Sequence, residues 1–406
     1  MSVFMVLAWR NLWRNRHRTL ITMGSVFFAV ILVLFVRSMQ LGTYEHMITN
    51  TLKIYTGFIH VQGEEFWETR SLENSMDFEP QRREMISRIT GVVSVVPRLE
   101  SFALASSGEK TRGAMVTGIA PEVENRMNDL AERVVKGEYL QSGSEGALIA
   151  RGLAEYLDAG IGDTLILLSQ GYYGASAAGA FAISGIVDLP LPDLNNSAVY
   201  LTLDQAQFFF SMPERGTSLA IMIEDPDMLG RVTERLQEIY ENGYDVLTWR
   251  EMLPELVQSI EFDNAGGLIM LGILYLVIAF GIFGTVMMMT AERKREFAMM
   301  ISIGMKPRKL SLTVLFETIT IGLLGTIAGV VVSIPILLYM RANPIILTGE
   351  AAEAIRTYGF DPLIPFLVEP SLFINQGLVV FLVSVLVCIY PLWSITWLKV
   401  SNELRA

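Results

Sequence analysis

The chain has 406 residues, of which 51% are hydrophobic and 18% charged, and its formal net charge is −11 at pH 7. Its mean hydropathy of +0.42 is too high for an ordinary soluble protein, yet too low for a chain that lies wholly within a membrane. Composition therefore excludes both classes and predicts a membrane protein with a large water-exposed part.

Residues 1–18 predict an amphipathic helix on the cytoplasmic face of the membrane. Met5, Trp9, Leu12 and Trp13 share one helical face, while arginines at positions 10 and 14 lie on another. Such a helix lies in the interface with its apolar face toward the lipid. A simpler alternative, in which the arginines only orient the chain, is compatible with this interpretation.

Four apolar runs come next, and each is long enough to span a hydrocarbon core of about 30 Å, which takes about 20 helical residues. The first run has the basic flank of a signal peptide. Because no A-x-A-like cleavage site follows it, we expect a retained anchor. The predicted transmembrane helices cover residues 19–41, 264–291, 310–340 and 370–398.

The basic residues predict the orientation. Four arginines precede the first helix, six Lys or Arg residues separate the second from the third, and two follow the fourth, whereas residues 341–369 contain only two. By the positive-inside rule both termini, residues 292–309 and the tail 399–406 are cytoplasmic. We therefore expect a multi-pass protein of the bacterial inner membrane, with residues 42–263 and the short loop 341–369 in the periplasm.

Residues 42–263 hold 16 Lys and Arg against 34 Asp and Glu, a net charge of −18. This sign argues against a nucleic-acid partner. Apolar periodicity and turn signals predict an α+β domain of two interleaved lobes. The expected strands are 54–61, 92–106, 112–119, 164–168, 180–187, 198–201, 218–223 and 244–248, and the expected helices are 122–135, 150–157, 203–210 and 227–242.

Residues that could carry catalysis or hold a metal are scarce. Cys388 is the only cysteine and lies in the fourth predicted helix, so the outer domain is expected to fold without disulfides. The three histidines form no two-His metal motif, and the chain has no G-x-x-x-x-G-K-[ST] phosphate-binding loop. We therefore expect no enzyme activity, no catalytic residue, and no cofactor or metal bound by this chain.

The segment between the second and third predicted helices carries the strongest functional signal. Its basic start, its apolar stretch and its turn at Gly304 and Pro307 predict a short amphipathic helix. A solvated loop would not need that apolar stretch, so we favour a partner-binding helix over a helix on the membrane surface. The candidate contact residues are Glu292, Arg293, Glu296, Phe297, Met299, Met300, Ile303 and Gly304.

The third predicted helix contains a carboxylate and a run of glycines. Glu317 lies about 12 Å from the helix start by helical rise, and a charge is costly inside a membrane. We favour a structural ion pair near the cytoplasmic face over a proton relay. Gly325 and Gly329 form a G-x-x-x-G that lets another helix approach closely, and Gly322 precedes them.

These residues resemble the MacB-type permeases, which include FtsX, MacB, LolC and LolE. The resemblance rests on the Arg-rich start LAWRNLWRNRHRT, on an E-R-x-x-E-[IF]-[GA] segment at residues 292–298, on Gly304, and on Glu317 with the glycines after it. It spans the whole topology of one helix, a large periplasmic domain and three helices.

The resemblance implies a permease dimer, homodimeric or paired with a related subunit, that binds two ATPase subunits through the helix at 292–309. ATP and Mg would then be bound by the partner ATPase, whose closure would move the periplasmic domains. The first helix would continue outward to about Lys53 and the second would begin near Trp249, forming a stalk.

Within the family, FAISGIVD and SAVYLTLDQAQFFF are most similar to the LolC/LolE branch. That branch implies release of lipoproteins to a periplasmic carrier. The loop from Gln170 to Gly179 is predicted to be a hairpin tip, and it occupies the position of the carrier-recruiting hairpin, although it lacks the Pro and Arg expected there. Its candidate contact residues are Gln170, Tyr172 and Tyr173.

Three alternatives stay open at this point. One is a MacB-like mechanotransmission or efflux permease, which predicts an outer-membrane channel or adaptor as partner. Another is FtsX-like regulation of a cell-wall hydrolase. The third, of a different class, is a membrane receptor that works without an ATPase, against which the coupling-like segment at 292–309 argues.

Overall fold

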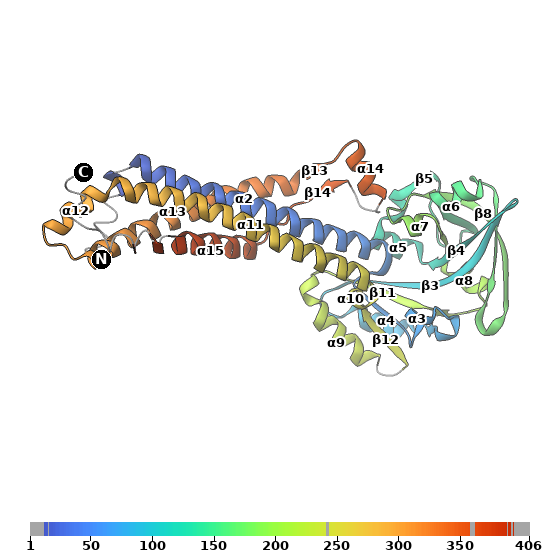
Figure 1. The fold of residues 1–406 in the computed structure, drawn as a ribbon. Helices are drawn as coiled ribbons and strands as arrows, with labels where there is room; N and C mark the ends of the chain where they lie inside the picture. Colours follow the sequence, from blue (N-terminus) through green and yellow to red (C-terminus); the bar gives the residue numbers. More distant parts are fainter. Residues whose placement is uncertain are drawn as a thin grey trace. The chain divides into compact units, whose positions relative to one another are not determined.

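The computed structural model describes residues 12–14, 16–240, 243–357, 362–387, 389–390 and 393. Met5, Trp9 and Cys388 lie outside these residues. The chain forms two compact units (Figure 1). The first comprises Met1–His46, Ser259–Ile346 and Leu363–Ala406, and the second comprises Met47–Gln258 and Leu347–Pro362.

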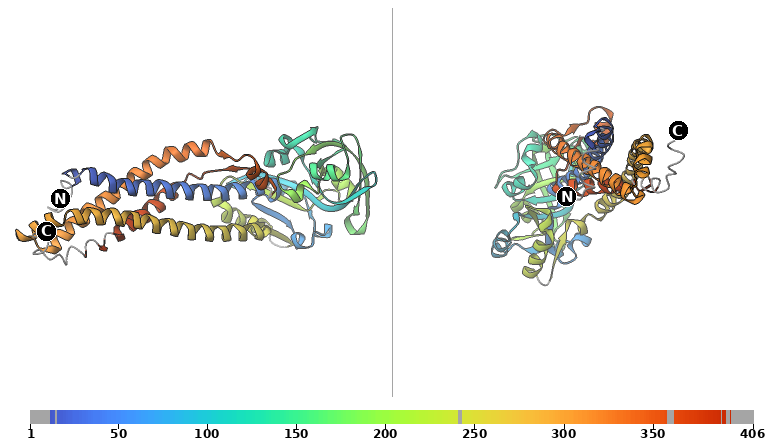
Figure 2. Two further views of the ribbon diagram at one scale, coloured as in Figure 1. Left: turned by 45° about the horizontal axis from the view of Figure 1, so that its top comes forward. Right: turned by 90° about the vertical axis from the view of Figure 1, so that its left-hand side faces the viewer.

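Four helices among the described residues are long and apolar enough to cross a membrane, which confirms the predicted number. Figure 2 shows three of them, α2, α11 and α13, running lengthwise beside one another. The helices of this part are α2 (Arg16–Thr51), α11 (Pro254–Glu292), α12 (Lys294–Ser302), α13 (Pro307–Ala342) and α15 (Pro370–Val387). Helix α2 is followed directly by the π-helix η1 (Leu52–Thr56), and α10 (Trp249–Met252) precedes α11.

Polar side chains join α2 to α11 in the first unit. The Arg37 guanidinium donates to the side-chain oxygens of Gln40 at 2.7 Å and Asn264 at 3.0 Å. The Tyr44 hydroxyl donates to Asp263 at 2.5 Å and accepts from Gln40 at 2.7 Å. Each of these groups therefore has a hydrogen-bond partner where the two helices meet.

The segment between α13 and α15 is more structured than the short loop predicted for 341–369. It contains β13 (Ile345–Ile346) paired antiparallel with β14 (Leu363–Ile364), and α14 (Glu350–Thr357). Residues 347–362 belong to the second unit. The prediction missed these elements because two-residue strands and an eight-residue helix leave little periodicity in a sequence.

The second unit is built on a ten-stranded mixed sheet in the order β12-β1-β11-β3-β4-β9-β6-β8-β5, with β7 paired to β3 and β8. Its strands are β1 (Ile59–Gly63), β3 (Val92–Ser107), β4 (Lys110–Ile119), β5 (Val134–Gly137), β6 (Gly146–Ala150), β7 (Thr164–Gln170), β8 (Ser176–Val187), β9 (Ala198–Thr202), β11 (Ser218–Ile223) and β12 (Tyr244–Thr248). The short strands β2 (Met76–Asp77) and β10 (Arg215–Gly216) form a separate pair.

Six of these strands close on themselves. Strand β7 pairs with β3 on one side and with β8 on the other, and β8 returns to β3 through β6, β9 and β4. Small side chains such as Ala103 and Ala105 face the interior core, whereas Phe102 and Leu104 of the same strand face outward. A ring of six strands encloses little volume, which accounts for the small interior residues.

Of the remaining four strands, β5 pairs with β8, while β12, β1 and β11 extend the sheet from the first half of β3 and carry a second core. This arrangement corresponds to the two predicted interleaved lobes. One lobe is built from strands at the start and the end of the domain sequence, the other is the ring of six strands, and the long strand β3 belongs to both. The helices of the unit are α3 (Phe66–Thr69), α4 (Pro80–Ser87), α5 (Pro121–Asn128), α6 (Arg151–Leu157), α7 (Pro192–Asn195), α8 (Leu203–Phe209) and α9 (Leu229–Ile239). Short 3-10 turns complete it at η2 (Leu72–Asn74), η3 (Leu130–Arg133), η4 (Tyr172–Gly174) and η5 (Pro226–Met228).

Three predicted elements of this unit differ from the structure. The helix expected at 122–135 ends at Asn128, because Asp129 adopts a left-handed conformation with φ 52°. The strand expected at 54–61 begins only at Ile59, since residues 52–56 remain helical. The helix expected at 227–242 begins as a 3-10 turn and is α-helical from Leu229 to Ile239. Strand β6 and helix α4 were not predicted.

A buried ion cluster crosses the sheet of this unit. Arg98, on β3, donates to both carboxylate oxygens of Glu124 at 2.5 and 3.0 Å, and both side chains are almost fully buried. Glu100 lies two residues along β3 and accepts from Arg70 at 3.2 Å. Paired and hydrogen-bonded charges of this kind tolerate burial, whereas a lone one does not.

Candidate functional site

Helix α12 stands between two sharp changes of chain direction. Arg293 occupies its N-cap position, and Ile303 and Gly304 end it. Gly304 has φ +101°, which side chains with a Cβ rarely adopt. Pro307 then occupies the first turn of α13, where its missing N–H is not needed.

One face of α12 is anchored to α13. Phe297 and Ala298 are buried, and Phe297 forms a small core with Leu310 and Val314. Met300 packs against this core from the side. The apolar stretch therefore is not exposed as a whole, as the sequence analysis had assumed, because an amphipathic helix beside a longer one buries its apolar face first.

The opposite edge of α12 exposes apolar side chains. Met299 is 49% exposed and Ile303 is 87% exposed. Glu292, at the end of α11, is also exposed. Basic side chains surround this edge in the sequence and are exposed as well, namely Arg295, Lys306, Arg308 and Lys309. An apolar edge within a basic surface suits a protein partner with apolar and acidic groups.

An ion-pair chain ties α12 to α13 and to the N-terminal segment. The Arg293 Nη1 donates to both carboxylate oxygens of Glu317, at 2.7 and 2.8 Å, and both side chains are buried. Glu296 lies 3.5 Å from Arg293 Nε and accepts from Arg14 Nη2 at 3.1 Å. The guanidinium of Arg293 also lies 5.1 Å from the ring centroid of Phe297. The expected ion pair of Glu317 is confirmed, and its partner is now identified.

The N-terminal segment differs from its prediction at Leu12. Leu12 is buried in a cluster with Met289 of α11 and Ile321 of α13, whereas Trp13 is 67% exposed. Leu12 therefore faces neighbouring helices rather than lipid. Arg14 was predicted to lie on the polar face of this helix, and no local pattern indicated its contact with Glu296, which lies 282 residues away.

The glycines of α13 lie where other helices approach. A Cβ at Gly325 would lie 2.9 Å from the Met23 carbonyl oxygen, and one at Gly329 would lie 2.8 Å from the Val30 Cβ, both on α2. A Cβ at Gly322 would lie 2.7 Å from the Ser384 hydroxyl on α15. The predicted close approach is confirmed, and α2 is the helix that uses the G-x-x-x-G.

The predicted hairpin tip is confirmed between β7 and β8, where Gln170 pairs with Ser176. The tip itself is shorter than the predicted loop, because the strands extend into it. Tyr173 has φ 50° and is 77% exposed. Tyr172 packs against the core inside the six-stranded ring. The guanidinium of Arg215 lies 5.2 Å from the centroid of the Tyr172 side-chain ring. Only Tyr173 of these two tyrosines is free to reach a partner.

Among the described residues, no group of three or more His, Cys, Asp or Glu side chains could hold a metal ion.

Comparison with known families matches both parts of the chain. The model described as FtsX-like permease C-terminal matches residues 268–400, and the model described as MacB-like periplasmic core domain matches residues 19–239. Together they cover the four apolar helices and most of the sheet unit.

Individual relatives are distant. The chain is 24% identical over 249 residues to a lipoprotein-releasing system transmembrane protein LolC of Xylella fastidiosa, which covers 59% of each chain. The chain thus spans about three fifths of the length of this curated relative. It is 29% identical over 192 residues to the ABC transporter permease YtrF of Bacillus subtilis, covering 45% of this chain and 44% of that one.

Among solved structures, the periplasmic region of MacB from Actinobacillus actinomycetemcomitans aligns with a TM-score of 0.36 and 14% identity. The alignment covers 52% of this chain and 96% of that one. At this score the likeness is partial, and the assignment of the sheet unit rests on the family model.

Proposed function

The chain belongs to the family of FtsX-like permeases that carry a MacB-like periplasmic core domain, and on this premise we propose that it is the permease subunit of an ABC transporter. The observation that carries the proposal is α12. One face of this helix is anchored by Phe297, and its other edge presents Met299 and Ile303 to solvent. That edge is the docking surface for an ATPase subunit, which binds the ATP and Mg.

In this proposal α12 and α13 move together when the ATPase closes. The buried Arg293–Glu317 pair and the Phe297 core join the two helices. A displacement of α12 by the ATPase therefore moves α13 with it as a rigid body. The glycines of α13 hold α2 close, and α2 continues to Thr51 without a break. A continuous helix is stiff and transmits displacement along its axis.

The proposed orientation follows from charge. Residues 292–309 and both termini lie in the cytoplasm, and the acidic sheet unit lies in the periplasm. Residues 347–362 belong to the same unit as that domain, which supports the proposed placement of the α13–α15 segment on the periplasmic side. A second permease subunit, identical or related, completes the assembly.

The proposed task is release of lipoproteins from the inner membrane to a periplasmic carrier. Relatives named as lipoprotein-releasing subunits support it. The exposed hairpin tip with Tyr173 is then the carrier contact, with Gln170 at its base. The match to a MacB-like core favours one second candidate, a MacB-like mechanotransmission permease.

The ATPase interaction is tested by affinity purification of the tagged chain from mild detergent. Met299→Arg with Ile303→Arg places two charges on the exposed edge without disturbing the Phe297 core. We expect this variant to lose the co-purifying ATP-binding subunit. The matched control is Phe208→Arg, at a residue that is 88% exposed on the sheet unit. Retained ATPase in the double variant, at normal expression, contradicts the docking role of α12.

The same purification separates the two tasks by what accompanies the ATPase. Acylated lipoproteins in the purified complex support lipoprotein release. An adaptor or channel protein in their place supports mechanotransmission. Absence of any ATP-binding subunit from the wild-type preparation supports a receptor and overturns the proposal.

A further inference from the structure

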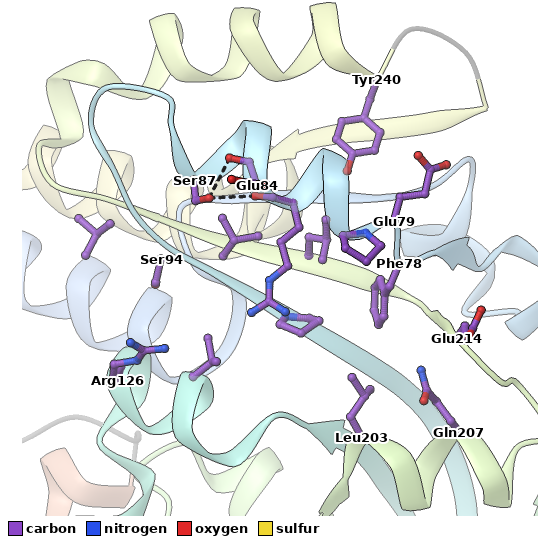
Figure 3. A pocket seen from close by; sticks show the side chains of 17 residues that line it. Phe78, Glu79, Glu84, Ser87, Ser94, Arg126, Leu203, Gln207, Glu214 and Tyr240 are labelled. Atoms are coloured by element: carbon purple, nitrogen blue, oxygen red, sulfur yellow. Dashed lines mark hydrogen bonds between the residues drawn. The ribbon is translucent and has the colours of Figure 1, made fainter. Parts of the chain in front are cut away.

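An open groove of about 1030 Å³ lies on the sheet unit, and neither α12 nor the hairpin tip contributes a residue to its lining. Figure 3 shows that its walls come from α4, α5 and α8, with β3 crossing between them. Apolar side chains line much of it, including Phe78, Val95, Pro97 and Leu203. No sequence pattern indicates this groove, because its walls come from segments up to about 160 residues apart.

Two arginines on different helices line the groove. Arg83 belongs to α4, and Arg126 belongs to α5, where Figure 3 shows it. Across the described part of the chain, neither guanidinium makes a hydrogen bond or a salt bridge, whereas Arg82 and Arg88 of α4 both do. Both groove arginines therefore have their donors available to a ligand.

The three acidic residues that line the groove make no salt bridge with either arginine. Glu79 pairs with Arg82 at 3.1 Å, Glu84 pairs with Arg88 at 2.6 Å, and Glu214 is the third. Burial lowers the pKa of the Arg83 guanidinium, and the positive charge of Arg126 lowers it further. Both causes disfavour two cations in this place, and an anion between them relieves the repulsion.

The lining indicates which kind of anion fits. The groove is partly open to solvent, so an acyl chain within it would stay partly in water. Its apolar floor alternates with polar groups such as Ser94 and Gln207, which can bond a peptide backbone. A groove with apolar contacts, backbone partners and cationic anchors suits an extended polypeptide better than a lipid.

We propose that this groove binds an extended, carboxylate-bearing segment of a partner polypeptide, with Arg83 and Arg126 holding the carboxylates. The inference stands apart from the ATPase docking surface and holds whichever transported substrate the permease handles.

The test uses the full chain in detergent and a panel of fluorescent peptides of about twelve residues. Each peptide has two glutamates at varied spacing in an apolar background, and a matched set has glutamine at the same positions. We expect anisotropy to show tighter binding of at least one glutamate peptide than of its glutamine counterpart. Charge-assisted contacts of this kind predict a loss of about tenfold or more in Arg83→Gln with Arg126→Gln.

Two controls keep the test decisive. Arg231→Gln removes an exposed arginine of α9 outside the groove and should leave binding unchanged. Arg83→Lys with Arg126→Lys keeps the charges and should lose less affinity than the glutamine variant. Equal binding of glutamate and glutamine peptides, or equal loss in Arg231→Gln, overturns the proposal. Displacement of bound peptide by monomeric lysophosphatidylglycerol, with loss of lysolipid binding in the glutamine variant, assigns the groove to lipid and also overturns it.

Discussion

Replacing Glu317 with glutamine removes the counter-ion of a buried arginine at the junction of α12 and α13. Arg293 is 2% exposed and Glu317 is 1% exposed, and one guanidinium nitrogen lies 2.7 and 2.8 Å from the two carboxylate oxygens. The other described contact of Arg293 with an acid is Glu296, whose nearest oxygen is 3.5 Å away and which is half-exposed. Glutamine keeps the shape of the side chain but loses its charge.

The expected cost follows from the charge left behind. Two unit charges about 4 Å apart attract by about 4 kcal/mol at an effective dielectric constant of 20. Removing one partner of a buried pair typically destabilises a protein by about 3–5 kcal/mol, because the remaining charge stays desolvated. We expect Glu317→Gln and Arg293→Gln each to lower the free energy of unfolding by about 3 kcal/mol, the lower end, since Glu296 compensates in part.

The double variant separates this account from simple loss of packing. With both charges gone, the cost should be well below the sum of the single variants, by about 2 kcal/mol or more. Reversible unfolding in mixed detergent and SDS micelles measures all four proteins of the cycle. A coupling energy below about 0.5 kcal/mol would refute the inference that this pair joins α12 to α13.

Three further outcomes follow from single residues. Burial and two neighbouring arginines lower the pKa of His60 to about 3, so this histidine stays neutral in the folded protein while the unfolded chain takes up a proton below pH 6.5. The free energy of unfolding is therefore highest above that pH and falls by about 2 kcal/mol by pH 5. The free energy of unfolding of His60→Gln, measured in urea, should depend less steeply on pH than that of the wild type. An unchanged slope would contradict this account. Gly325→Ala should lower the free energy of unfolding in detergent by about 1–3 kcal/mol, because the added Cβ meets α2. The control Gly272→Ala, whose added Cβ would have nothing within 4 Å, should lower it little. Equal effects of the two substitutions would refute the contact. Tyr173→Ala should leave thermal stability unchanged yet weaken crosslinking of the hairpin tip to its periplasmic partner, while undiminished crosslinking would remove this residue from the contact.

Sequence patterns predicted the membrane part well because its physics is local. A helix must satisfy its own backbone in lipid, so length and hydropathy identify it without knowledge of its neighbours. The G-x-x-x-G of α13 indicated close packing for the same reason, since it needs only two small residues one turn apart. The pattern could not say that α2 is the partner.

Contacts between distant residues were out of reach of such patterns. Phe297 belongs to an apolar stretch that the sequence analysis assigned to a partner surface, yet it packs on Leu310 and Val314. Arg14 and Glu296 are 282 residues apart, and neither has a local signal for the other. Tertiary packing decides which apolar residues of an amphipathic helix remain exposed, and only that exposure separates Met299 and Ile303 from the buried Phe297.

By itself, the sequence determined four membrane helices, an acidic α+β domain after the first of them, and a short amphipathic helix after the second. The tertiary structure alone decided that β7 closes a ring with β3 and β8, so that Ala103 and Ala105 line the interior while Phe102 and Leu104 face outward. It also brought Arg83 and Arg126 to one groove. Periodicity reports which residues share a face, but the partner of that face depends on strand pairing between segments far apart in the chain.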